Sequence, residues 1–91
     1  MATKLEPQQI ESRLNPGWAT DGDQITKTYE FAQYSHGLLF ASALGLIAES
    51  MDHHPDLLVS YKKVTVSLST HSAGGVTELD LELAEAVDRL V

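Results

Sequence analysis

Three of the four histidines, His53, His54 and His71, lie at the predicted ends of secondary-structure elements, where a scaffold often presents functional side chains. His53 and His54 directly precede Pro55, which ends a helix, and His71 precedes a loop that contains two glycines. Free imidazole titrates at about pH 6.5, so each ring can donate or accept a proton near neutral pH. The pattern favours general acid–base chemistry between residues 49 and 80.

A carboxylate accompanies the first of these histidines. Glu49 lies one turn before His53 on the same predicted helix face, where it could orient the imidazole or stabilise its charge. A purely structural reading of His53 stays open, because a histidine at a helix C-terminus often only contacts exposed carbonyls and the helix dipole. His36 lies in the first turn of the long predicted helix, and we interpret it as structural or solvated.

Zinc binding is one alternative use of these histidines. Two adjacent histidines with a distant third could supply three ligands. Neighbouring histidines cannot easily aim at one ion, however, and the chain has no cysteine and no His-Glu-x-x-His pattern. The sequence therefore predicts no metal site.

Hydrolytic chemistry is a second alternative, suggested by Ser67, Ser69 and Thr70 near the histidines. No Gly-x-Ser-x-Gly elbow surrounds these hydroxyls, so we interpret them as the polar face of a strand that could hydrogen-bond a ligand. Gly74-Gly75 lacks the lysine of a phosphate-binding loop and is better read as a turn before a helix.

The region from Glu49 to Asp80 contains a spaced set of residues: Glu49-x-x-x-His53-His54-Pro55, then Tyr61, His71 and Asp80. Its most specific segments are Asp52-His53-His54-Pro55-Asp56 and Leu68-Ser69-Thr70-His71. This set closely resembles the signature of the pterin-4a-carbinolamine dehydratases, which are also known as dimerisation cofactors of a homeodomain transcription factor. The predicted order of elements resembles that of the family across essentially the whole chain.

The resemblance implies a hydro-lyase, 4a-hydroxytetrahydrobiopterin dehydratase. Such an enzyme converts the pterin 4a-carbinolamine to quinonoid dihydropterin and water during tetrahydrobiopterin recycling, with no metal or organic cofactor. Loss of water requires one proton delivered to the leaving hydroxyl and one removed from a ring nitrogen, which imidazoles can do near neutral pH.

The resemblance also implies roles for individual residues. His53 and His71 would be the acid and the base, in an order that the sequence does not assign, while His54 positions the pterin and Glu49 orients His53. The substrate-binding residues would be His53, His54, Pro55, Thr70, His71, Ser72 and Ala73. Asp52 and Asp80 would support the site, with Asp80 organising the loop, capping the last helix or holding an imidazole.

Two positions depart from the family pattern. Leu57 stands where many members have an aromatic residue, and Ala73 stands where some have cysteine. Both changes affect the pocket lining, so the side chain of the preferred pterin stays open. A non-catalytic binding, assembly or transcription-coactivator module on the same fold is the alternative function. Retention of His53, His54 and His71 favours the enzyme.

The elements that must position these residues form one domain over residues 1–91. The expected fold is α+β, an antiparallel sheet of three to four strands with three helices packed on one face, in the order α-β-β-α-β-β-α. The predicted elements are a helix opening at Glu6-Pro7, a hairpin of 18–20 and 24–31 around Asp21-Gly22-Asp23, a helix over 34–52, strand over 58–70 that splits in two, and a last helix capped by Thr77 and Asp80.

Both long helices have apolar residues at helical spacing. In the first, Leu39, Ala43, Leu46, Ile47 and Ser50 form a stripe that Leu38, Phe40 and Leu44 widen. One side can cover the sheet and another can meet a second subunit. In the last helix the expected stripe is Leu79, Leu83, Ala86, Val87 and Leu90.

Composition narrows the class of protein further. The formal net charge of −7 opposes direct binding to nucleic acid and to anionic membrane surfaces. We find no apolar stretch of membrane-spanning or signal-peptide type and no cysteine, so we expect a cytoplasmic protein. A chain of 91 residues buries a modest core, and we expect a homodimer or homotetramer.

Overall fold

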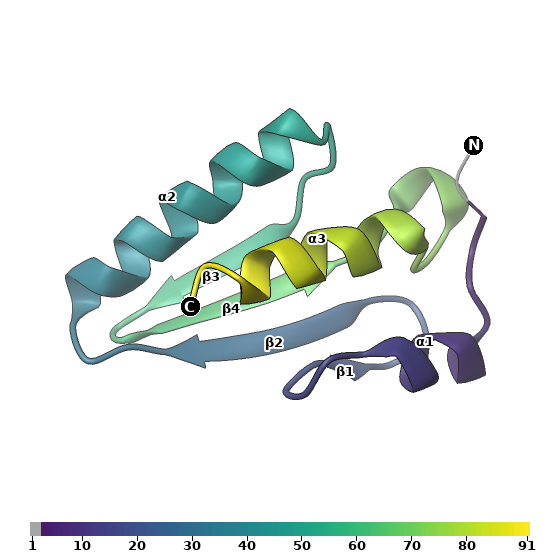
Figure 1. Ribbon diagram of the computed structural model, residues 1–91, viewed down its shortest axis with the longest axis horizontal. Coiled ribbons are helices and arrows are strands. Elements are labelled where there is room, and N and C mark those ends of the chain that lie inside the picture. The colour runs from purple at the N-terminus through teal and green to yellow at the C-terminus, as the bar shows by residue number, and fades with distance from the viewer. Residues whose placement is uncertain (1–2) are drawn as a thin grey trace.

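Four antiparallel strands form one sheet (Figure 1). The computed structural model describes residues 3–91, so the first two residues of the expected 1–91 domain lie outside the described part. The sheet order is β1-β2-β4-β3, with β1 at Ala19–Thr20, β2 at Ile25–Glu30, β3 at Asp56–Ser60 and β4 at Lys63–Leu68.

The helices are α1 at Pro7–Arg13, α2 at Tyr34–Ser50 and α3 at Glu78–Asp88, with a short 3-10 helix η1 at His71–Ala73. The α+β class and the α-β-β-α-β-β-α order are therefore confirmed. The strand predicted over 58–70 splits into β3 and β4 at a tight turn, where Lys62 takes a positive φ of 61°. Pairing begins two residues earlier than predicted, at Asp56.

One face of the sheet supports the core, as the alternation of strand residues predicts. Buried side chains of β2 and β4 meet those of the helices in a single cluster that includes Ile10, Ile25, Tyr29, Phe40, Leu44, Val64, Val66, Leu68, Leu83 and Val87. The opposite face is polar, and Thr28 and Thr65 hydrogen-bond across β2 and β4 on it, at 3.0 Å. Figure 1 shows α2 and α3 on the same side of the sheet.

Part of the α2 stripe expected from the sequence faces away from the sheet, although Ile47 packs against the core. Leu39 and Leu46 are 69% and 74% exposed, whereas the buried residues of α2 are Gly37, Phe40, Leu44 and Ala48. Gly37 explains this choice of face, because a Cβ there would lie 3.3 Å from Cγ2 of Val64 in β4. The helix packs closely along the face that this glycine opens.

The α3 stripe is also shifted. Leu79 and Ala86 are half-buried and Leu90 is 39% exposed, whereas Leu81 and Ala84 are buried together with Leu83 and Val87. Asp80 sets this phase, because its side chain is fully buried and the residues three, four and seven positions later share its face. Within residues 3–91, none of the helices has the length and apolarity that crossing a membrane requires.

Candidate active site

Two segments that are distant in sequence line one cavity of about 340 Å³. One follows α2 and the other follows β4; together they contribute Asp52, His53, His54, Ser69, Thr70, His71 and Ser72. The predicted convergence of the three histidines on one pocket, with Thr70 and Ser72 beside them, is confirmed. A cavity of this size with polar lining is suited to a small molecule.

The first segment is shaped by the end of α2. Asp52 takes a positive φ of 51°, and the His53 N–H donates at 3.0 Å to the Ala48 carbonyl in the last turn, which also accepts from the Met51 N–H at 3.1 Å. Pro55 cannot continue a helix and restricts His54 to extended backbone. His53 and His54 therefore lie in the segment that connects the end of α2 to β3.

The second segment is a loop closed on itself. Thr70 and Gly75 exchange two backbone hydrogen bonds, of 2.8 and 3.3 Å, and Gly74 takes a positive φ of 75° between them. Glycine accommodates that conformation without strain. The 3-10 turn between these anchors presents His71 and Ser72 as exposed side chains at the cavity.

His53 is the shielded histidine of the site. It is 8% exposed, and its Nε2 lies 2.5 Å from Oδ1 of the fully buried Asp80. The expected pairing of Glu49 with His53 is wrong. Because α2 ends at Ser50, His53 no longer follows helical spacing, and the first turn of α3 supplies its carboxylate instead.

Asp80 also performs the cap that the sequence predicted. Its Oδ2 accepts hydrogen bonds of 2.8 Å from the Thr77 backbone N–H and from the Thr70 hydroxyl, and Thr77 caps α3 reciprocally. The same carboxylate therefore caps the start of α3, anchors the loop before it and holds an imidazole.

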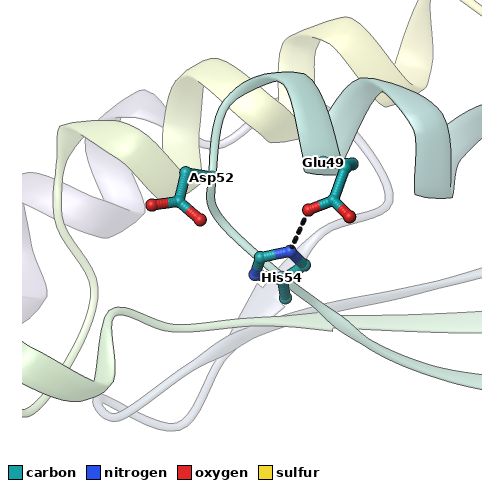
Figure 2. A group of neighbouring side chains, drawn as sticks. All are labelled: Glu49, Asp52 and His54. Atoms are coloured by element: carbon teal, nitrogen blue, oxygen red, sulfur yellow. Dashed lines mark hydrogen bonds and ion pairs between the residues drawn. The ribbon is translucent and has the colours of Figure 1, made fainter.

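Glu49 contacts the other histidine of the pair. Its Oε1 lies 2.8 Å from Nε2 of His54, and both side chains are exposed (Figure 2). The hydrogen bond that His54 donates to Glu49 raises the pKa of His54 above its usual range, since it favours the charged imidazole. The ligand atoms of Glu49, Asp52 and His54 all lie within 4.8 Å of one another, which makes them the candidate metal-binding group among residues 3–91.

The remaining predicted site residues differ in position. Pro55 and Ala73 do not line the cavity but adjoin residues that do, and Glu49 and Asp80 reach it through the histidines they bond. Ser69 lines the cavity without having been assigned to the site, although its place on the polar strand face was visible in the sequence. The substrate-binding and catalytic roles stay predictions.

The arrangement brings three imidazoles in different environments to one polar cavity. His53 is buried against a carboxylate, His54 is exposed against another, and His71 is exposed on a loop. Two of the rings are oriented by carboxylates, as in sites where an imidazole exchanges protons with a ligand. Such a cavity can deliver a proton to one atom of a bound molecule and remove one from another.

Comparisons with known proteins agree with this reading. Residues 3–90 match the family model described as pterin 4 alpha carbinolamine dehydratase. A protein of Natronomonas pharaonis, provisionally named pterin-4-alpha-carbinolamine dehydratase, is 43% identical over 90 residues, covering 99% of this chain and 98% of the relative. A Sulfurisphaera tokodaii protein with the same provisional name is also 43% identical over 90 residues, covering 97% of each chain.

A solved structure has the same fold. The crystal structure titled as a transcriptional coactivator/pterin dehydratase from Brucella melitensis superposes with a TM-score of 0.91 at 35% sequence identity. The superposition covers 97% of this chain and 98% of the other.

Proposed function

The chain belongs to the pterin 4 alpha carbinolamine dehydratase family, and from this premise we propose that it dehydrates 4a-hydroxytetrahydropterin to quinonoid dihydropterin and water. The observation that carries the proposal is the meeting of His53, His54 and His71 at one polar cavity. By contrast, a second cavity of about 280 Å³ contains one histidine, His36, among apolar side chains.

The chemistry follows from proton transfer alone. The bond between C4a and its hydroxyl oxygen breaks as the oxygen takes a proton and leaves as water. The neighbouring ring nitrogen loses its proton, and its electron pair forms the new carbon–nitrogen double bond. Imidazoles held in place near neutral pH can accelerate such a step by about 10²–10⁴-fold. His53 and His71 are the proposed pair, with His54 and the Thr70–Ala73 loop holding the pterin.

The direct test is the decay of the 4a-carbinolamine with purified protein. His53→Ala and His71→Ala should each slow the enzymatic decay at least about tenfold, because each removes a group that moves a proton. His36→Ala is the matched control, since His36 is exposed and does not line the cavity. Rates unchanged in both cavity variants would contradict the proposal, provided that circular dichroism shows them folded.

The finer identity of the reaction is part of the same proposal. We take 4a-hydroxytetrahydrobiopterin as the substrate, recycled in the cytoplasm, with no metal or organic cofactor. The rate should therefore be unchanged after dialysis against a chelator. Leu57 and Ala73 are the two departures from the family pattern. Dehydration rates of 4a-carbinolamines with different side chains would show how these two residues affect the choice of substrate.

A protein-binding role is the second candidate, and one surface favours it. One apolar face of α2 is exposed to solvent. The exposed fractions of its leucines lie between 42% and 74%, for Leu38, Leu39 and Leu46. A face of this kind suits either another copy of the chain, as in the expected homodimer or homotetramer, or a different protein. Light scattering after size-exclusion chromatography separates these two: a monomer at micromolar concentration would favour a different partner.

A further inference from the structure

A pair of buried threonine hydroxyls lies behind the carboxylate that holds His53. Thr77 is fully buried and Thr70 is 5% exposed, and their hydroxyl oxygens are 2.7 Å apart. The Thr70 oxygen is also 2.8 Å from Oδ2 of Asp80. Buried hydroxyls need partners, and these two have found them in a line that ends at the site.

Counting donors gives this line a direction. The Thr70 hydroxyl has one proton, which it donates to Asp80 Oδ2. The 2.7 Å bond between the two threonines must then be donated by Thr77. The Thr77 oxygen in turn accepts from the Leu79 backbone N–H at 3.3 Å. Every bond in the line points toward the carboxylate.

The far oxygen of Asp80 therefore receives two donors, the Thr70 hydroxyl and the Thr77 backbone N–H. An oxygen that accepts twice has no room for a proton, and this arrangement favours the ionised carboxylate. Its other oxygen, Oδ1, then needs a donor, and the group that faces it is Nε2 of His53. With the carboxylate ionised, Nε2 is the donor and carries hydrogen.

We propose that Thr70 and Thr77 are positioning residues that fix neutral His53 as its Nε2–H tautomer, so that Nδ1 is the nitrogen that exchanges a proton with the ligand. This inference rests on the proposed function for its chemical meaning. No hydrogen bond joins Nδ1 to the described residues. Since none of their buried side-chain nitrogen or oxygen atoms lacks a partner, Nδ1 is accessible to solvent, and His53 lines the cavity. Neutral His53 accepts a proton there, and charged His53 donates it from the same atom.

The consequence is a defined geometry for proton transfer. If the carboxylate were free to change its protonation, His53 could adopt the opposite tautomer and present no lone pair at Nδ1. The threonine line removes that freedom. Of these hydrogen-bonded residues, only Thr70 and His53 line the cavity. Thr77 therefore acts on the site indirectly, through Thr70.

The first experiment needs no variant of the line. Two-bond proton–nitrogen correlation spectra of the ¹⁵N-labelled protein at alkaline pH report which ring nitrogen of each histidine carries hydrogen. The His53 signals are identified by their loss in His53→Gln. Hydrogen on Nε2 with an unprotonated Nδ1 is the expected result. Hydrogen on Nδ1, on both nitrogens or in rapid exchange between them would overturn the inference.

The second experiment removes hydroxyls one at a time. Thr70→Val should populate the Nδ1–H tautomer and lower the dehydration kcat about tenfold or more, whereas Thr70→Ser should keep the wild-type tautomer. Thr77→Val and Thr77→Ser should follow the same pattern with a smaller change. Thr28→Val is the matched control, since it breaks a threonine pair on the opposite, polar sheet face.

Folding and function are kept apart in these tests. Amide proton–nitrogen spectra show whether each variant is folded. If a valine variant is unfolded, the tautomer measured in the wild-type protein still tests the inference. A wild-type tautomer that persists in both folded valine variants would overturn the role of the threonines. An Nε2–H tautomer in a protein without dehydratase activity would contradict the proposed function and leave the positioning intact.

Discussion

Two aspartates at opposite ends of α3 show how one helix serves both the site and the fold. Asp80 lies in the first turn and bonds His53, Thr70 and the Thr77 backbone, all at the cavity or directly behind it. Asp88 is the last helical residue, about 12 Å away along the axis. Its carboxylate accepts from Trp18, Lys27 and Tyr29, at 3.0, 2.8 and 2.5 Å.

The difference lies in what each carboxylate holds still. Asp80 is fully buried and organises groups that a ligand would meet, whereas Asp88 is 20% exposed and joins α3 to β2 and to the segment before β1. Both have several donors, so hydrogen-bond number alone does not mark a functional carboxylate. What distinguishes the two carboxylates is the partner that each one holds. Asp80 holds an imidazole at a cavity, whereas Asp88 holds side chains that stabilise the fold.

The largest expected effect comes from Asp80→Asn. An amide has one acceptor oxygen and one NH₂ group. If the oxygen keeps the Thr70 and Thr77 donors, the NH₂ group faces Nε2 of His53 and favours the opposite tautomer; in the other orientation the NH₂ group faces the two donors. We expect a fall in kcat of about 10²–10⁴-fold for a change of this kind. Initial rates of carbinolamine decay measure it.

Asp88→Asn is the matched control for that experiment. The same change of atoms at the other end of α3 should leave kcat within about twofold, because none of the partners of Asp88 lines the cavity. Equal losses of kcat in the two folded variants would contradict the division of labour between the aspartates.

The effect of Asp88 should appear in stability. Asp88→Ala removes a charged acceptor from three well-placed donors, and we expect the free energy of unfolding to fall by about 2–3 kcal/mol. Urea denaturation followed by circular dichroism measures this change. The rate per folded molecule should stay at the wild-type value; a variant as stable as the wild type would show that the network contributes little.

The contribution of Asp88 should also depend on pH. Burial acts to raise the pKa of Asp88, but the hydrogen bonds from Lys27, Tyr29 and Trp18 outweigh it and hold the pKa below its usual range. The folded chain therefore binds this proton more weakly than the unfolded chain. The stabilisation is complete above the unfolded pKa and is lost as the pH falls through the folded pKa.

Asp88→Asn tests that dependence. The difference in unfolding free energy between wild type and variant should be largest near neutral pH and shrink in acid, below about pH 4. Urea titrations at several pH values give the difference directly. A gap that is constant from neutral to strongly acid pH would show that charge at Asp88 is not what stabilises the network.

Much of the site region could be predicted from local pattern. The cap formed by Thr77 and Asp80 follows from a short sequence motif, and the convergence of His53 with His71 follows from the ends of two elements in a compact fold. Family resemblance made the convergence specific. These features depend on residues close in sequence or on element order, which sequence patterns describe well.

The errors share a different cause. The partner of Glu49 depended on where α2 ends, and helix ends are the least certain part of a sequence-based assignment. The buried face of α2 depended on the close approach allowed by Gly37, which no hydrophobic count includes. The Asp88 network joins α3 to Trp18 and Lys27 across the whole chain, and only tertiary packing reveals it.

The smallest expected effect belongs to Glu49, the exposed counterpart of Asp80. Glu49→Gln removes the carboxylate that raises the pKa of His54, so that pKa should fall toward its ordinary value in an NMR titration. The pair stabilises the fold only while His54 is charged, below its folded pKa, and that contribution is lost as the pH rises through it. Both side chains are exposed to solvent, which screens their charges. The free energy of unfolding at neutral pH should therefore barely change. A large loss of stability would place Glu49 with Asp88 as a framework residue, whereas an unchanged His54 pKa would remove it from the group of carboxylates that tune an imidazole.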